Sequence, residues 1–178
     1  MKKVCVLLAD GFEEIEGLTV VDLLRRAKIY VDTISIMDDY IVHGAHGINV
    51  QTEDLFDEVD FDDYIGLFIT GGRSPEYIRM DHKVISLVKC FVRSGKPVAA
   101  ICHAAQVLTA ADVVCGRKLT CYPALAAEVK LAGGNYIEVA PDEAVVDCNL
   151  ITSPAWPGNT AILREFVKAL GCEFVFRS

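Results

Sequence analysis

The sequence predicts an α/β fold in which a doubly wound, mostly parallel sheet carries helices on both faces. Short apolar runs alternate with amphipathic segments along the chain, which is the pattern of strands joined by crossover helices. The 178 residues, 52% of them hydrophobic, suffice for one substantial core, and no linker, low-complexity stretch or repeat divides them. We therefore expect residues 1–178 to form a single domain.

The N-terminal half is expected to contain the first strands of this sheet and its two longest helices. The expected elements are a strand at 4–9, a helix at 13–27, a strand at 30–37, an edge hairpin at 43–50, a strand at 64–70 and a helix at 81–94. The first helix has acids in its first turn and basic residues in its last, as the helix dipole favours. Gly71-Gly72 ends the third strand, and Gly95 ends the second helix.

The C-terminal half continues the alternation with shorter elements. After the strand that leads from Lys96-Pro97 to Cys102, the expected elements are a helix at 104–110, a strand at 119–121, a helix at 123–133, strands at 136–139, 144–146 and 150–152, and a helix at 160–170. The last two strands form a hairpin. Ligands of such sheets bind beyond the carboxyl ends of the strands. That rule brings together the segments 10–16, 71–76 and 102–103.

Cys102 is the candidate nucleophile, because it stands between a buried strand and a helix. A helix N-terminus presents free N–H groups and the positive end of the dipole, which favours a thiolate. Ala100 and Ala104 supply the small flanking residues that a tight nucleophile turn needs. His103 is the adjacent candidate base, although it needs a suitable rotamer to serve Cys102. The alternative is a core cysteine that acts as a small hydrophobic residue.

Three glutamates share the first turn of the first expected helix: Glu13, Glu14 and Glu16. At most one or two of them can face the cysteine, and dipole compensation explains the others. A carboxyl held against a cysteine in a sheltered pocket is partly protonated and can donate a hydrogen bond to the sulfur. Gly71-Gly72 allows close backbone approach, so that an N–H can face a developing oxyanion.

The sequence gives little support for a metal site or a disulfide framework. His43-x-x-His46 has no accompanying cysteine or third histidine, so we do not expect it to bind a metal. The seven cysteines are an odd number without a C-x-x-C pair, which favours free thiols and a cytoplasmic location. We expect no cofactor.

The charge balance excludes two classes of partner. A net charge of −8 and a pI near 4.9 disfavour nucleic acid and membrane surfaces, which attract basic patches.

The apolar run at the N-terminus ends at Asp10, so we interpret it as a strand rather than a signal peptide, and no later segment is long enough to span a membrane. The high apolar content is consistent with a homo-oligomer.

Several spaced motifs resemble the DJ-1/PfpI (ThiJ/PfpI) superfamily across essentially the whole chain. The matching segments are Ala-Asp-Gly-Phe-Glu-Glu-Ile-Glu at 9–16, Gly-Gly-Arg-Ser-Pro-Glu at 71–76, Ala-Ala-Ile-Cys-His at 99–103, Gly-Arg-Lys-Leu-Thr-Cys-Tyr-Pro at 116–123, and Ile-Thr-Ser at 151–153 with Pro-Gly at 157–158. The resemblance implies the flavodoxin-like three-layer sandwich shared with class I glutamine amidotransferases. Those amidotransferases use a late histidine, and no histidine follows His103.

The resemblance also implies roles for individual residues. Cys102 is similar to the family nucleophile, Glu16 to the acid that hydrogen-bonds it, and Gly72 and His103 to the residues whose N–H groups form the oxyanion hole. In the PfpI branch a glutamate from a neighbouring subunit completes the Cys-His pair, and Glu76 stands at that place. The chain combines features of two branches, and Pro154-Ala155-Trp156 replaces an arginine that both branches carry.

Three hypotheses follow from these features. The first is an enzyme in which Cys102 attacks an electrophilic carbonyl, with glyoxalase III-like or deglycase-like chemistry, or amidase or peptidase chemistry, on a small carbonyl or peptide-like substrate. The second is a redox-sensing or chaperone-type stress protein in which Cys102 is oxidised. The third is a binding protein that has lost its activity, for which the missing arginine is the indication. The pairing with His103 favours the enzyme.

Overall fold

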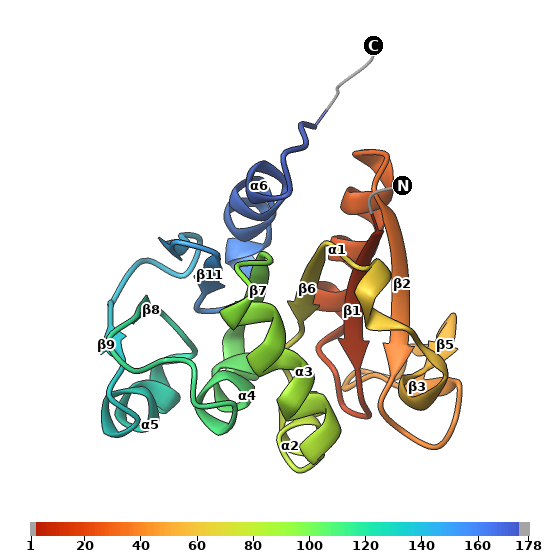
Figure 1. Ribbon diagram of the computed structural model, residues 1–178, viewed down its shortest axis with the longest axis horizontal. Helices are drawn as coiled ribbons and strands as arrows, with labels where there is room; N and C mark the ends of the chain where they lie inside the picture. Colours follow the sequence, from red (N-terminus) through yellow and green to blue (C-terminus); the bar gives the residue numbers. More distant parts are fainter. Residues whose placement is uncertain (1–2, 175–178) are drawn as a thin grey trace.

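The computed structural model describes residues 3–174, which fold around a seven-stranded central sheet of order β10-β11-β7-β6-β1-β2-β5. The strands are β1 Lys3–Leu8, β2 Tyr30–Ser35, β5 Asp54–Leu55, β6 Gly66–Ile69, β7 Val98–Ile101, β10 Val145–Asp147 and β11 Leu150–Ser153. All neighbours pair in parallel except β10 and β11. Figure 1 shows β11, β7, β6, β1 and β2 side by side. The predicted mostly parallel α/β fold is confirmed.

The helices connect these strands and differ from the predicted ones mainly at their ends. They are α1 Glu14–Arg26, α2 Ser74–Ile78, α3 His82–Arg93, α4 Ala105–Ala110, α5 Ala126–Leu131 and α6 Asn159–Ala169. Short 3-10 helices lie at Phe56–Glu58, Phe61–Asp63, Cys102–Ala104, Pro123–Leu125 and Trp156–Gly158. Asp81 begins α3 because its carboxylate accepts hydrogen bonds from the N–H groups of Lys83 and Val84. The sequence analysis missed α2 and the first two 3-10 helices.

Two hydrophobic layers enclose the sheet, one on each face. Strand side chains alternate between them, so that Cys5 and Leu7 of β1 enter one layer while Val6 and Leu8 enter the other. Residues of α3, α4 and α5 complete the first layer, and residues of α1 and α6 complete the second. This arrangement is the three-layer sandwich that the family resemblance implies. It leaves the strand ends as the places where polar groups can meet.

Two small sheets lie beside the central one. The predicted hairpin at residues 43–50 forms from β3 Ile41–His43 and β4 Asn49–Gln51, as a two-stranded sheet of its own, while β5 occupies the edge of the central sheet. The predicted strands near residues 119 and 136 pair as β8 Lys118–Leu119 and β9 Asn135–Tyr136, in a second separate pair. Both pairs are thus separate from the central sheet.

The connections reverse direction at β1, which pairs with β2 on one side and β6 on the other. Chains that wind in opposite directions from such a point leave a crevice at the carboxyl ends of the strands. The segments after β1, β6 and β7 meet there: Phe12 forms an isolated antiparallel bridge with Gly72, and Arg73 donates a backbone hydrogen bond to Gly11 at 2.8 Å. The predicted grouping of these three segments is observed.

Two general properties complete the description. Between residues 3 and 174, no helix combines the length and the apolar character required to cross a bilayer. The thiols of Cys5, Cys90, Cys102, Cys115, Cys121 and Cys148 are free, and those of Cys5, Cys102 and Cys121 are buried.

Candidate active site

Cys102 follows β7 directly and adopts a backbone conformation that is rare for a residue with a side chain. Its φ is +60°, in the left-handed region, between the extended Ile101 and a single 3-10 turn. Strain of this kind costs about 1–3 kcal/mol and persists where the surrounding structure imposes it. The turn directs the thiol to the crevice at the carboxyl end of β6 and β7. The predicted nucleophile elbow is therefore present.

Gly71 is the residue against which the thiol packs. A Cβ at Gly71 would lie 2.6 Å from Cβ of Cys102 and 2.4 Å from Oε2 of Glu16, so a larger residue would displace one of them. Its N–H donates a 2.8 Å hydrogen bond to that same Oε2. Gly72 has φ +72°, and a Cβ at this residue would lie only 2.3 Å from the carbonyl oxygen of Gly11, so no side chain fits there. The glycine pair thus permits the close approach that the sequence analysis predicted.

Glu16 lies beside Cys102 and is fully buried, at 0% exposure. Burial raises the pKa of Glu16 to about 7; the Gly71 N–H and the Cys102 thiol act to lower it, and the charge of Glu13 raises it further. At neutral pH the carboxyl is therefore about half protonated. This agrees with the expectation that an acid held against the cysteine retains its proton and can donate it.

Cys102 itself differs from the sequence-based prediction of a readily formed thiolate. Burial and the charge of Glu16 raise the pKa of the Cys102 thiol to about 12, although the N–H groups of His103 and Gly72 act in the opposite direction. Desolvation prevails because Cys102 is 9% exposed and the helix that follows, α4, is only six residues long. The contribution of Glu16 requires the ionised carboxyl, so it is absent whenever Glu16 carries the proton.

His103 is placed to take the proton of this thiol. Its Nδ1 lies 3.2 Å from Sγ of Cys102, so adjacent residues do meet here, because the strained backbone of Cys102 turns its side chain toward the ring. Burial lowers the pKa of His103, while the charge of Glu76 acts to raise it. The imidazole is accordingly neutral at pH 7. With the ring proton on Nε2, Nδ1 can accept a hydrogen bond from the thiol.

Tyr122 is a contact that sequence reasoning missed. Its ring stacks on the imidazole of His103, with centroids 4.6 Å apart and planes inclined by 23°. Its backbone N–H donates to the carbonyl of Cys102 at 3.2 Å. Tyr122 therefore orients both members of the Cys-His pair. The signal was available in the Thr-Cys-Tyr-Pro segment, whose tyrosine follows a predicted strand.

Glu76 lies in α2 on the same side of the molecule, but it is not part of the buried group. Its side chain is 56% exposed and forms an ion pair of 3.7 Å with Arg73. Its charge nevertheless acts to raise the pKa of His103, against the larger effect of burial, so the two groups interact. Of the five predicted site residues, Cys102, His103, Glu16 and Gly72 come together directly, and Glu76 stands at the rim.

The other two acids of the first turn have functions beyond dipole compensation. Glu14 is buried, and burial acts to raise its pKa, yet hydrogen bonds from the N–H groups of Glu14, His46 and Ile48 reverse that effect and lower it. Glu13 meets the ring of His46, with Oε2 and Nε2 3.2 Å apart. Both acids thus hold the loop between β3 and β4, which the sequence analysis did not predict.

Comparisons with known proteins agree with this geometry. The family model of the DJ-1/PfpI family matches residues 2–169. The chain is 40% identical to Deglycase TK1284 of Thermococcus kodakarensis, covering 94% of this chain and 99% of that protein. It is 38% identical to Protein/nucleic acid deglycase 2 of Escherichia coli, covering 96% and 98%.

Two further comparisons concern length and fold. The chain is 38% identical to Protein DJ-1 homolog D of Arabidopsis thaliana over 96% of its own length, but spans only 48% of that protein. A solved structure of a DJ-1 superfamily protein from Salmonella typhimurium has a TM-score of 0.86 at 30% identity, covering 96% of this chain and 91% of the other. Fold, motif positions and sequence similarity agree, and the chain belongs to the DJ-1/PfpI family.

Proposed function

We propose that this chain is a cysteine-dependent enzyme that acts on an electrophilic carbonyl, with deglycase or glyoxalase-like activity. The observation that carries the proposal is the strained Cys102, with Nδ1 of His103 at 3.2 Å from its sulfur and a half-protonated Glu16 beside it. Relatives over nearly the full length are named deglycases, which supports the same class of substrate.

The first step of the proposed reaction forms the oxyanion of a hemithioacetal, which becomes the hemithioacetal when the oxygen takes a proton. Sγ of Cys102 attacks the carbonyl carbon, the carbon–sulfur bond forms, and the electron pair of the carbonyl moves to its oxygen. Nδ1 of His103 takes the thiol proton, because the neutral imidazole is the base in contact with it. The N–H groups of Gly72 and His103, which face the sulfur, are the donors nearest to the developing oxyanion.

Glu16 supplies the second proton-transfer group. Because its pKa is about 7, both its acid and its conjugate base are populated at neutral pH. Glu16 can therefore give a proton to, or remove one from, the carbon or oxygen atoms of the bound intermediate. A carboxyl with an ordinary pKa would be ionised throughout and lack this function.

The proposed active species is a homo-oligomer. Glu76 is exposed in the single chain, and apolar side chains beside it are exposed as well, Tyr77 by 41% and Met80 by 77%. A second copy of the chain that covers these side chains would bury them. It would also bring a Glu76 carboxylate toward His103 across the subunit boundary. In the expected result, light scattering detects a dimer or larger species, and Glu76→Gln lowers activity by roughly 10- to 1,000-fold without changing the fold. A fully active monomer would contradict the oligomeric site.

The decisive experiment compares wild type with Cys102→Ser in turnover of methylglyoxal and of a methylglyoxal-modified amine. We expect Cys102→Ser to lose activity by at least about 1,000-fold, as in other enzymes that lose their nucleophile. Cys90→Ser is the matched control, because Cys90 is a free, exposed cysteine on α3. Equal turnover by wild type and Cys102→Ser would refute the proposal.

A redox-sensing function is the second candidate, and the same protein preparations distinguish it. Oxidation of a cysteine follows thiolate character and exposure, and Cys102 is buried with a raised pKa. These properties favour the enzyme, in which His103 generates the nucleophile on demand. Stoichiometric oxidation of Cys102 by mild peroxide without any carbonyl turnover would favour the sensor.

A further inference from the structure

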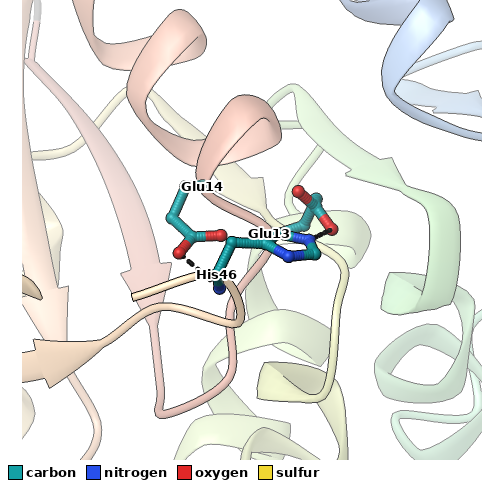
Figure 2. Close-up of side chains that lie close together, drawn as sticks. All are labelled: Glu13, Glu14 and His46. Carbon is teal, nitrogen blue, oxygen red and sulfur yellow. Dashed lines mark hydrogen bonds and ion pairs between the residues drawn. The ribbon is translucent and has the colours of Figure 1, made fainter. Parts of the chain in front are cut away.

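Glu13, Glu14 and His46 converge from two segments that are more than thirty residues apart in the sequence. Glu13 and Glu14 begin α1, and His46 lies in the loop between β3 and β4. One oxygen or nitrogen atom from each residue lies within 4.8 Å of the other two. Figure 2 shows the imidazole of His46 between the two glutamates, with its ring in contact with Glu13.

Glu14 is fixed in this cluster by the backbone around it. Its Oε1 accepts hydrogen bonds from the N–H groups of His46, at 2.6 Å, and Ile48, at 3.2 Å. A Cβ at Gly44 would lie 2.4 Å from the same oxygen, so the loop packs directly on the carboxylate and requires glycine there. The position of Glu14 therefore does not depend on the exposed side chains nearby.

The second oxygen of Glu14 has no such partner. Glu14 is 4% exposed, and its Oε2 is buried without a hydrogen bond from any described residue. Figure 2 shows one carboxylate oxygen bonded to the backbone of His46 and the other directed toward the side chain of His46. Buried polar oxygens are nearly always satisfied in folded proteins, so this one indicates an additional ligand.

The ring of His46 does not serve as that ligand in the structure. Its Nε2 contacts Oε2 of Glu13 at 3.2 Å, and Oε2 of Glu14 has no hydrogen-bond donor among the described residues. A cation bound between the three groups would satisfy all of them at once. Two carboxylate oxygens and one imidazole nitrogen are a donor set that Zn²⁺ and similar divalent ions accept, with water in the remaining position.

The spacing of the donors fits such an ion. Zn²⁺ bonds to nitrogen and oxygen are about 2.0–2.1 Å long, which places tetrahedral ligand atoms about 3.3 Å apart. The pair formed by Nε2 of His46 and Oε2 of Glu13 has that separation already, at 3.2 Å. The side chain of His46 is 71% exposed, so its ring is free to adjust toward the fixed carboxylate of Glu14.

We propose that Glu13, Glu14 and His46 form a binding site for a divalent transition-metal cation such as Zn²⁺, separate from the catalytic cysteine. The bound ion joins the start of α1 to the loop between β3 and β4. It would thereby fix the turn that also carries Glu16. The proposal does not depend on the chemistry of Cys102.

Titration calorimetry with Zn²⁺ tests the site directly. All preparations are first treated with a chelator and carry Cys102→Ser, which removes the thiol of the candidate active site from competition. We expect one saturable site in this protein and an affinity at least about tenfold lower when His46→Ala is added, since even outer-shell changes cost 10- to 100-fold at metal sites. His82→Ala is the control, because His82 is an exposed histidine at the start of α3.

A second variant and a second probe guard against misinterpretation. Glu13→Gln changes a partly exposed ligand and should also weaken binding by at least about tenfold, while Glu14→Gln removes a buried charge that the loop needs. Co²⁺ bound at this site should show no sulfur-to-metal charge-transfer band, and Zn²⁺ should raise the thermal unfolding midpoint only when His46 is present. Binding that survives both His46→Ala and Glu13→Gln, binding through thiols, or no saturable binding at all would overturn the proposal.

Discussion

Glu14 and Glu16 stand two residues apart in the first turn of α1, and burial acts to raise the pKa of both, yet the net pKa shifts of the two carboxyl groups are opposite. Glu14 receives N–H hydrogen bonds from its own residue and from His46 and Ile48, and its pKa falls. Glu16 receives one from Gly71 and lies against a thiol, with the charge of Glu13 nearby, and its pKa rises to about 7.

The difference teaches that the donors aimed at a buried carboxylate decide its charge together with the desolvation around it, which is greater at Glu16 than at Glu14. A carboxylate with several N–H donors remains ionised even when solvent is excluded, whereas one with a single donor recovers its proton. In this chain the first arrangement anchors a loop, and the second provides a proton donor beside a nucleophile. Replacing the glutamate by glutamine is therefore expected to change activity and stability differently at the two sites.

The largest expected effect is on catalysis. Glu16→Gln keeps an acceptor for the Gly71 N–H but cannot transfer a proton, so we expect activity to fall by roughly 100- to 10,000-fold. Steady-state rates with methylglyoxal across a range of pH provide the measurement. Asp22→Asn is the control, because Asp22 lies on the exposed face of the same helix, paired with Arg26. Normal rates in Glu16→Gln would show that proton transfer by Glu16 is not needed for catalysis.

The next effect is on stability at alkaline pH. The folded protein binds the Glu16 proton more tightly than the unfolded chain, so this contribution is complete below about pH 4.5 and is lost as the pH rises through about 7. The change in pKa from 4.5 to about 7 corresponds to roughly 3 kcal/mol. Denaturant unfolding should find Glu16→Gln more stable than wild type near pH 8, with little difference near pH 4.

The stability of Glu14→Gln relative to wild type should depend on pH in the opposite way to that of Glu16→Gln, with a smaller amplitude. Its lowered pKa gives stability that is present above about pH 4.5 and is lost as the pH falls through the folded-state value. The amide keeps an acceptor for the loop N–H groups but loses the charge, so we expect a loss of about 1 kcal/mol near neutral pH. Unfolding measured in chelator should show this loss shrink in acid. Parallel pH profiles for the two variants would show that the donors do not distinguish the sites.

The smallest effect concerns the reactivity of the thiol. The charge of Glu16 raises the pKa of Cys102, so Glu16→Gln should lower it and speed alkylation of Cys102 near pH 8, even though turnover falls. Peptide mapping after limited iodoacetamide treatment measures this rate, with the exposed Cys90 as the internal reference. Slower alkylation of Cys102 in the variant would indicate that Glu16 stabilises the thiolate.

Local patterns predicted most of the architecture. Alternating apolar runs identified the strands that form the centre of the sheet, and capping residues such as Asp81 located helix ends, because both depend on neighbours in the sequence. The two-residue strand β5 and the five-residue helix α2 were missed, since elements of that length have no period to detect. The hairpin was found, but its separation from the central sheet was not.

The sequence by itself determined that Cys102 ends a buried strand, next to His103 and opposite a glycine pair, and that an acid of the first helix faces it. The family resemblance singled out Glu16 as that acid, and only the tertiary structure decided how each group is charged. Desolvation, donor number and nearby charges arise from residues that are distant in the sequence: Gly71 for Glu16, His46 for Glu14, and Glu16 for Cys102. For that reason the pKa of the Cys102 thiol is raised, contrary to the predicted bias toward a thiolate, while the tight turn predicted at Cys102 is present.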